Sequence, residues 1–205
     1  ATQLRIGRWL TAAPSWSVSL CVMRGARVDV DLRSHDSLDL RTFGTVFRCT
    51  FVTIPDSAFD GFVPFGAHGA AHAKGGTPFN RPENGIFRPG AGFRELFFTE
   101  TGDTNANTQV GAARGGFGAL FKLTRAKNTD SWTLSLFYRS DVAHTGFDNI
   151  CFLTKDLVLS CEDAGDTLHG QRNALDSMFM FDANADYALA ANVPAASADP
   201  HGVRP

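Results

Sequence analysis

The stretch RPENGIF, residues 81–87, decides the fold because it returns in altered form as FDNICF at residues 147–152. In both stretches an acidic residue and an asparagine stand directly before a short apolar segment. These pairs are Glu83 with Asn84 and Asp148 with Asn149. An acid–amide pair that recurs 65 positions later, at the same point of a similar segment, indicates an internal repeat.

The similarity continues beyond the two pairs. Each apolar segment leads through a turn to a second apolar strand, which ends in a glutamate followed shortly by Gly-Asp. A third strand follows in both units, and a fourth follows in the first. The matching runs are FRELFFTETGD (93–103) with DLVLSCEDAGD (156–166), FGALFKLT (117–124) with SMFMFD (177–182), and WTLSLFY (132–138) as the fourth strand. Repeated units of about four strands are typical of β-propeller blades.

Composition supports a fold made of short strands and many turns. The chain has 205 residues, with 18 Phe against two Tyr, 20 Gly and 9 Pro. We therefore predict an all-β protein, a partial β-propeller of about three four-stranded blades. Long loops are expected at 104–115 and 167–176.

Three parts are expected along the chain. Residues 1–54 hold N-terminal strands at 15–23, 26–34 and 45–54, residues 55–190 hold the blades, and residues 191–205 form an Ala- and Pro-rich tail. Such a chain cannot close a ring, so its strand edges would be exposed and would favour oligomerisation.

Charge and hydropathy exclude several classes of partner. A net charge of −2 gives no electrostatic reason to expect binding to nucleic acid. No apolar run is long enough for a transmembrane helix, and the first residues do not have the pattern of a signal peptide.

The cysteines lack the CxxC spacing of zinc ribbons. Cys151 and Cys161 each lie in an apolar run, so we expect buried free thiols there. A disulfide between them across a hairpin is the alternative.

The position of the acid–amide pairs predicts a metal site. In a propeller the first strand of each blade lines the central channel, so Glu83 and Asp148 would converge from neighbouring blades. Like charges brought together need a cation, a proton or solvent. Carboxylate and amide oxygens are ligands that a hard cation such as calcium prefers, so we expect a cation. The alternative is that Asp and Asn open the strands as turn-forming residues.

Two further acids end apolar strands. Glu100 and Glu162 follow such strands directly, so both are expected to be half-buried, and a buried acid needs a metal or an arginine as partner. The candidate arginines are Arg81, Arg114 and Arg172. A solvated strand end is the alternative for both acids.

Several runs resemble the PhoX-type alkaline phosphatase family, which includes many secreted bacterial propellers. The resemblance covers about residues 60–190. Its runs are FRPGAGFRELFFTETGDTNANTQVG (87–111), GGFGALFKLT (115–124), LFYRSDVAHTGFDNICFL (136–153) and SCEDAGDTLHGQRNALDSMFMFD (160–182). RPEN resembles the RPE segment of the family and FDN its PDN segment. Members of the family are much longer, so the chain resembles a fragment.

The resemblance implies a chemistry. Glu83, Asp148, Asn149 and Glu162 would bind the metal, which would be calcium, with iron as a further metal. The reaction would be hydrolysis of a small phosphate ester. We expect Arg81 or Arg172 to hold the phosphate by paired hydrogen bonds. The location would be periplasmic or extracellular. The alternative is a calcium-stabilised propeller that serves as a binding or scaffold protein without catalysis.

Overall fold

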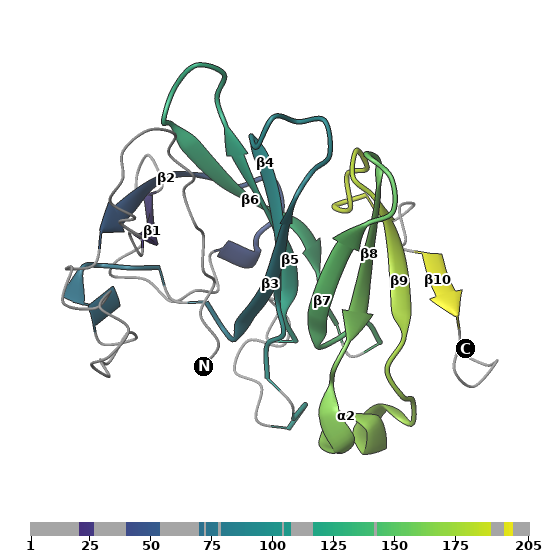
Figure 1. Cartoon of the computed structure of the whole chain (residues 1–205). Helices are drawn as coiled ribbons and strands as arrows, with labels where there is room; N and C mark the ends of the chain where they lie inside the picture. Colours follow the sequence, from purple (N-terminus) through teal and green to yellow (C-terminus); the bar gives the residue numbers. More distant parts are fainter. Residues whose placement is uncertain are drawn as a thin grey trace, which may run out of the picture.

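The computed structural model describes residues 21–26, 40–53, 70–71, 73–77, 79–103, 105–107, 117–141, 143–189 and 195–198. These residues form two antiparallel β-sheets and a helix, α2 (Figure 1). The prediction of an all-β protein is therefore confirmed. Within these ranges no helix has the length and hydropathy needed to cross a membrane.

The first sheet has the strand order β1-β2-β6-β5-β4-β3, with all neighbours antiparallel. Its strands are β1 (Cys21–Ala26), β2 (Val46–Thr53), β3 (Pro82–Phe87), β4 (Glu95–Glu100), β5 (Ala119–Arg125) and β6 (Trp132–Arg139). Strands β3 to β6 follow one another in space as they do in sequence, as expected for a four-stranded unit.

The N-terminal strands belong to this sheet and do not form a blade of their own. β2 confirms the strand predicted at 45–54, and it pairs with β6. β1 contains residues 21–23 of the first predicted strand but runs on to Ala26. Residues 15–20 and 27–34, which carry the rest of the first two predicted strands, lie outside the described residues. The described residues thus form two sheets, neither of them closed, where three blades were expected.

The second sheet has the order β10-β9-β8-β7 and is also antiparallel. Its strands are β7 (Phe147–Phe152), β8 (Leu157–Glu162), β9 (Met178–Asp182) and β10 (Ala195–Ala198). The fourth strand of the second unit thus lies in the predicted C-terminal tail.

The segment predicted as a loop at 167–176 is mostly helix, because α2 spans Gly165–Arg172 between β8 and β9. Asp166 lies in its first turn and Arg172 in its last turn, which suits the helix dipole. Asn173 ends the helix in a left-handed conformation. Leu168 is the buried residue of α2, so the sequence offers no apolar periodicity from which to predict this helix.

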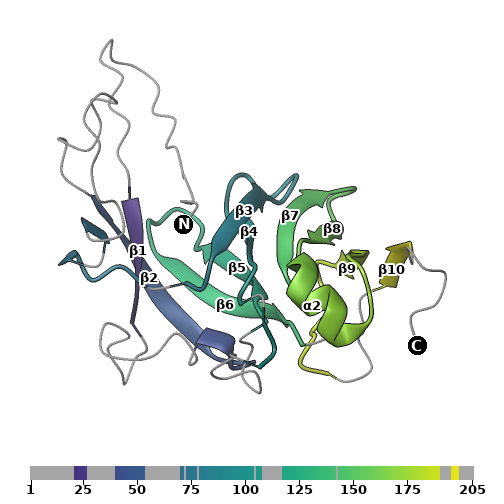
Figure 2. The same ribbon diagram turned by 90° about the horizontal axis from the view of Figure 1, so that it is seen from below.

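The two sheets meet where their edge strands β3 and β7 lie side by side, and they diverge from there (Figure 2). Aromatic side chains fill the space between the sheets: Phe97 packs edge-on against both Phe137 of the first sheet and Phe152 of the second. The burial of each Phe side chain stabilises the folded state by about 1.5–3 kcal/mol. The remaining buried members of this core include Leu120, Tyr138, Phe147, Ile150, Val158, Phe179 and Phe181.

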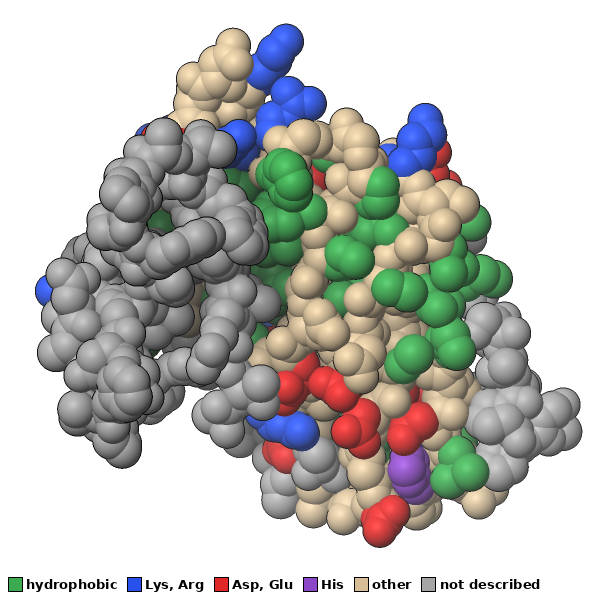
Figure 3. Space-filling model, viewed as in Figure 1, with side chains coloured by type: hydrophobic (Ala, Val, Ile, Leu, Met, Phe, Trp, Pro, Cys, Tyr) green, Lys and Arg blue, Asp and Glu red, His purple; other side chains and the backbone are tan. Residues whose placement is uncertain are grey.

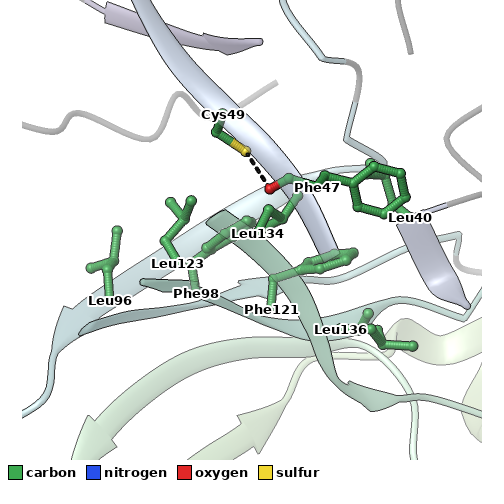
Figure 4. Packing of buried hydrophobic residues seen from close by; sticks show 10 residues of the cluster. Leu40, Phe47, Cys49, Leu96, Phe98, Phe121, Leu123, Leu134 and Leu136 are labelled. Carbon is green, nitrogen blue, oxygen red and sulfur yellow. Dashed lines mark hydrogen bonds between the residues drawn. The ribbon is translucent and has the colours of Figure 1, made fainter. Parts of the chain in front are cut away.

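The other face of the first sheet has a core of its own (Figure 4). Phe47 of β2 joins this core with Phe98 of β4 and Phe121 of β5. Cys49 is buried there with its Sγ atom 3.6 Å from the carbonyl oxygen of Phe47. Burial raises the pKa of the Cys49 thiol to about 12, so this cysteine is an unreactive core residue.

Polar contacts made by Arg88 also join the sheets. Its Nε donates to the carbonyl oxygen of Lys155 (2.7 Å), and its Nη2 donates to Asp156 Oδ1 (2.6 Å) and Asn184 Oδ1 (2.7 Å). Its Nη1 donates to Glu95 in its own sheet (3.1 Å). One guanidinium thus joins the β3–β4 turn to the β7–β8 turn and to the residues after β9.

We predict that Arg88→Ala lowers the free energy of unfolding by about 1–3 kcal/mol, because it removes several charge-assisted hydrogen bonds at once. Urea denaturation at pH 7 measures this change. Arg94→Ala is the matched control, since Arg94 donates within its own turn to the carbonyl oxygen of Ala91. Equal losses in the two variants would contradict a specific role for Arg88.

The loss of stability in Arg88→Ala should depend on pH. Burial of Glu95 opposes its ionisation, but Lys122 and Arg88 outweigh burial and hold the pKa of Glu95 below its ordinary value of 4.5. The stability that this carboxylate contributes is present above pH 4.5 and is lost as the pH falls through the lowered pKa. The difference between wild type and Arg88→Ala should therefore shrink in acid.

Candidate functional site

Both acid–amide pairs lie at irregularities of strand pairing. The register between β3 and β4 shifts between Pro82 and Gly85, and the register between β7 and β8 shifts between Phe147 and Asn149. A β-bulge turns side chains away from the regular alternation of a strand. In both sheets, a β-bulge near the start of the first strand thus carries the acid–amide pair.

The two pairs come together. The side-chain amide of Asn84 donates to Asn149 Oδ1 at 3.1 Å, and the amide of Asn149 donates to Asp148 Oδ2 at 3.3 Å. A hydrogen-bonded chain thus runs from the head of β3 to the head of β7, as the repeat predicted.

Two threonines of β4 fix the position of β7. The hydroxyl of Thr99 accepts a hydrogen bond from the backbone N–H of Asn84 (3.0 Å) and donates to the carbonyl oxygen of Asp148 (2.7 Å). The hydroxyl of Thr101 donates to the carbonyl oxygen of Phe147 (3.2 Å). Both threonines are fully buried, so these bonds join the sheets away from water.

A third acid, Asp163, lies near the two bulges. Its backbone N–H donates to the carbonyl oxygen of Gly146 at 2.7 Å, which holds the end of β8 beside the start of β7. Gly146 has a φ of +72°, and a Cβ there would lie 2.8 Å from the Cα of Ala164. Only glycine fits this close approach.

The acids at this end of the molecule affect one another. The pKa of Asp148 is raised, first by burial and then by the negative charges of Glu83 and Asp163, while Arg81 opposes the rise. Figure 3 shows acidic side chains gathered near the ends of β3 and β7 and beside α2, with basic side chains close by. Carboxylates forced together in this way are stabilised by a cation or a proton.

Glu83, Asp148 and Asp163 form an acidic cluster. The oxygen atoms at this acidic cluster are suitable ligands for a hard cation. Glu83 and Asp148 offer carboxylate oxygens, and Asn149 offers an amide oxygen that now accepts a bond from Asn84. Across the described residues, no three His, Cys, Asp or Glu side chains are arranged to hold a metal ion. Glu83, Asp148 and Asn149 are therefore at most part of a ligand set.

The structure pairs Glu162 with Arg172, one of the arginines predicted as partners for the buried acids. Its carboxylate accepts bonds from Arg172 Nη1 (2.9 Å) and Nη2 (3.2 Å) and from the backbone N–H groups of Thr145 (2.9 Å) and Ser177 (2.7 Å). The side chains of Arg172 and Glu162 are 3% and 0% exposed. Both oxygens of Glu162 are therefore engaged in a buried ion pair, which does not fit a ligand of a cation.

Arg172 has further partners besides Glu162. It donates to Asp176 Oδ1 (3.3 Å) and to the carbonyl oxygens of Leu175 (3.0 Å) and Ala143 (3.4 Å). These contacts fasten the end of α2 to the loop before β7. In this structure the guanidinium of Arg172 stabilises the fold, and its predicted role in holding phosphate stays a prediction.

Glu100, at the end of β4, repeats the arrangement of Glu162. It is fully buried, and its carboxylate accepts hydrogen bonds from Arg41 Nε at 3.0 Å and from the backbone N–H of Asn80. Burial raises the pKa of Glu100, although Arg41 opposes the rise. The sequence correctly predicted a buried acid that needs a partner but not the identity of Arg41, which lies 59 positions away.

Arg81 is placed differently from Arg172. Its side chain is exposed, and its charge acts on Asp148 in the acidic cluster. Its φ of +61° is uncommon for a residue with a side chain, and its Nη1 donates to the carbonyl oxygen of Gly102 at 3.4 Å. Of the two predicted arginines, Arg81 is the one that lies at the acidic cluster.

Comparisons with known proteins agree with the fold. Neither a family model nor a curated protein matches this chain. A solved structure of PhoX from Pseudomonas fluorescens, in complex with vanadate as a transition state analogue, is similar with a TM-score of 0.51 and 15% sequence identity. The match covers 83% of this chain and 34% of that one, so this chain spans about a third of the length of PhoX. Similarity at this identity shows a PhoX-like fold and no more.

We predict that Asp148→Asn raises the melting temperature by roughly 1–4 °C in a buffer without divalent cations. The raised pKa means that ionised Asp148 costs stability at neutral pH, and the amide removes this cost. Differential scanning calorimetry at pH 7 measures the shift. For an acid with a raised pKa the cost falls as the pH falls, so the gain should shrink in acid. A lower melting temperature for the variant would mean that Asp148 is not under repulsion.

We also predict that Arg172→Ala lowers the free energy of unfolding by about 3–5 kcal/mol, because it leaves the buried charge of Glu162 without its partner. Arg81→Ala removes the same charge at an exposed position and should cost less than about 1 kcal/mol. Chemical denaturation of the two variants compares them. A small loss of unfolding free energy in Arg172→Ala would contradict a structural role for Arg172 and would favour its role in phosphate binding.

Proposed function

We propose that this chain is part of a calcium-dependent, PhoX-type phosphatase and that its two sheets are neighbouring blades of a partial β-propeller. The observation that carries the proposal is the convergence of two acid–amide pairs, from equivalent bulges of two sheets, in a fold similar to PhoX. The activity would be hydrolysis of a small phosphate ester.

The arrangement of the sheets supports the propeller. The four consecutive strands from β3 to β6 are followed by a second group of four from β7 to β10. The first strands of the two groups lie side by side, and the sheets diverge from them, as the inner strands of neighbouring blades do (Figure 2). Residues at the heads of inner strands face the mouth of a channel.

Glu83, Asp148 and Asn149 are the proposed ligands. Calcium takes six to eight oxygen ligands at about 2.3–2.6 Å, so further oxygens would come from water, substrate or other parts of the protein. Glu162 is not included, because its carboxylate oxygens are engaged by Arg172 and two backbone N–H groups. Iron, the further metal that the resemblance implies, stays a prediction.

Arg81 is the proposed phosphate-binding residue. A guanidinium can hold two phosphate oxygens by parallel hydrogen bonds and so fix the orientation of the ester. The strained backbone of Arg81 fixes where its side chain starts beside the acidic cluster. Bound calcium would supply positive charge that favours phosphoryl transfer.

The second candidate is a calcium-stabilised binding or scaffold protein without catalysis. The observation in its favour is that two of the predicted site residues, Glu162 and Arg172, are joined in a buried ion pair that serves the fold. Such a protein would bind the cation at the same pairs but would not hydrolyse esters.

Calcium titration with thermal melting tests the cation site. We expect millimolar calcium to raise the melting temperature of the wild type by several degrees, because a ligand that binds the folded state stabilises it. Glu83→Gln and Asp148→Asn should abolish the shift. Asp130→Asn, which removes one charge from the exposed β5–β6 turn, is the matched control and should keep it. A shift that survives both site substitutions would refute the site.

An assay with a chromogenic phosphate monoester separates the two functions. A hydrolase should turn over the ester only with calcium, and Arg81→Ala should lower kcat/KM by on the order of 100-fold while leaving the calcium shift in place. Calcium binding without hydrolysis by the wild type would favour the scaffold.

A further inference from the structure

The outward face of the second sheet carries a group of sulfur atoms that the proposed function does not use. Along β7, β8 and β9, side chains alternate between the core shared with the first sheet and the opposite face. Figure 3 shows hydrophobic side chains gathered over these strands. Cys151, Cys161 and Met178 are exposed or half-buried. The prediction that both thiols are buried is therefore wrong, because Cys151 is exposed and Cys161 is only half-buried.

The pairing of the strands places Cys151 and Cys161 next to each other on one face of the sheet. Cys161 of β8 is paired with Asn149 of β7 on one side and with Met178 of β9 on the other. Cys151 is paired with Leu159, which places it diagonally from Cys161 on the same face. The charge of Cys151 helps to raise the pKa of Cys161, after burial, which is a second sign that the two thiols are neighbours.

A disulfide does not suit this arrangement. Diagonal neighbours in an antiparallel pair lie roughly 7–8 Å apart, and a disulfide requires Cα atoms about 4.4–6.8 Å apart. A metal ion bonded to two sulfurs at about 2.3 Å each separates them by up to about 4.6 Å, more than twice the S–S bond. A metal can therefore bridge a gap that a direct bond cannot close without moving the strands.

We propose that Cys151 and Cys161 form a binding site for one Cu(I) ion, which lies between the two sulfurs. Thiolate sulfur is a soft ligand that suits Cu(I). Zinc usually takes four ligands in a tetrahedron, two more than these thiols supply. Both thiols lose their protons on binding, so two protons are released for each Cu(I) bound and no electron is transferred.

The site differs from the proposed calcium site in chemistry, although the two sites lie next to each other. The calcium ligands are oxygens at the heads of β3 and β7, and one of them, Asn149, is the strand partner of Cys161. The two sites share no proposed ligand. Glu83→Gln should therefore leave Cu(I) binding unchanged.

The test is an anaerobic titration of the full chain with Cu(I), in competition with a chromophoric Cu(I) chelator. We expect one Cu(I) per chain, and X-ray absorption spectra should show sulfur neighbours. Cys151→Ser and Cys161→Ser should each lower the affinity at least about tenfold, while Cys49→Ala should not, because Cys49 is buried in the other core.

Cys151 is exposed, so Cys151→Ser should fold and keeps the test valid if Cys161→Ser does not. Met180→Leu on β9 is a further control and should leave binding unchanged, because Met180 is paired with Leu159 and not with a cysteine. Binding that survives both serine substitutions would overturn the proposal, and so would a mass decrease of about 2 Da that shows a Cys151–Cys161 disulfide in place of metal binding.

Discussion

The hydroxyl of Thr99 is the contact on which the candidate site depends. It lies in β4, yet it bonds to the head of β3 and to the head of β7, the two strands that carry the acid–amide pairs. Since Thr99 is fully buried, loss of these bonds would leave backbone groups of both strands without partners away from water. Hydrogen bonds that involve neither carboxylate thus hold Glu83 and Asp148 near each other despite their repulsion.

The two halves of the repeat share the same structural features. In each, the first strand begins with a bulge, and the second strand ends in a buried glutamate that an arginine neutralises. Glu100 has Arg41 from a distant segment, and Glu162 has Arg172 from the helix that follows. These buried pairs fix the strand ends, which is why the proposed ligands are the more exposed acids at the bulges.

Much of this was predictable from sequence, because strand alternation and internal repetition are local signals. They gave the all-β fold, the strands from β3 to β9 and the convergence of the acid–amide pairs. Arg41 was not predictable as the partner of Glu100, because ion pairs between distant segments leave no mark on either segment. Helix α2 was missed because it buries only Leu168. The exposure of Cys151 was missed because Cys151 lies in the apolar run ICFL at residues 150–153.

The central claim is that the two bulges form one cation site, and anomalous X-ray scattering tests it most directly. Crystals of the chain grown with calcium should show an anomalous peak between the carboxylates of Glu83 and Asp148, about 2.3–2.6 Å from oxygens of both. A calcium peak bound elsewhere, with the acids at the bulges facing only water, would contradict the account.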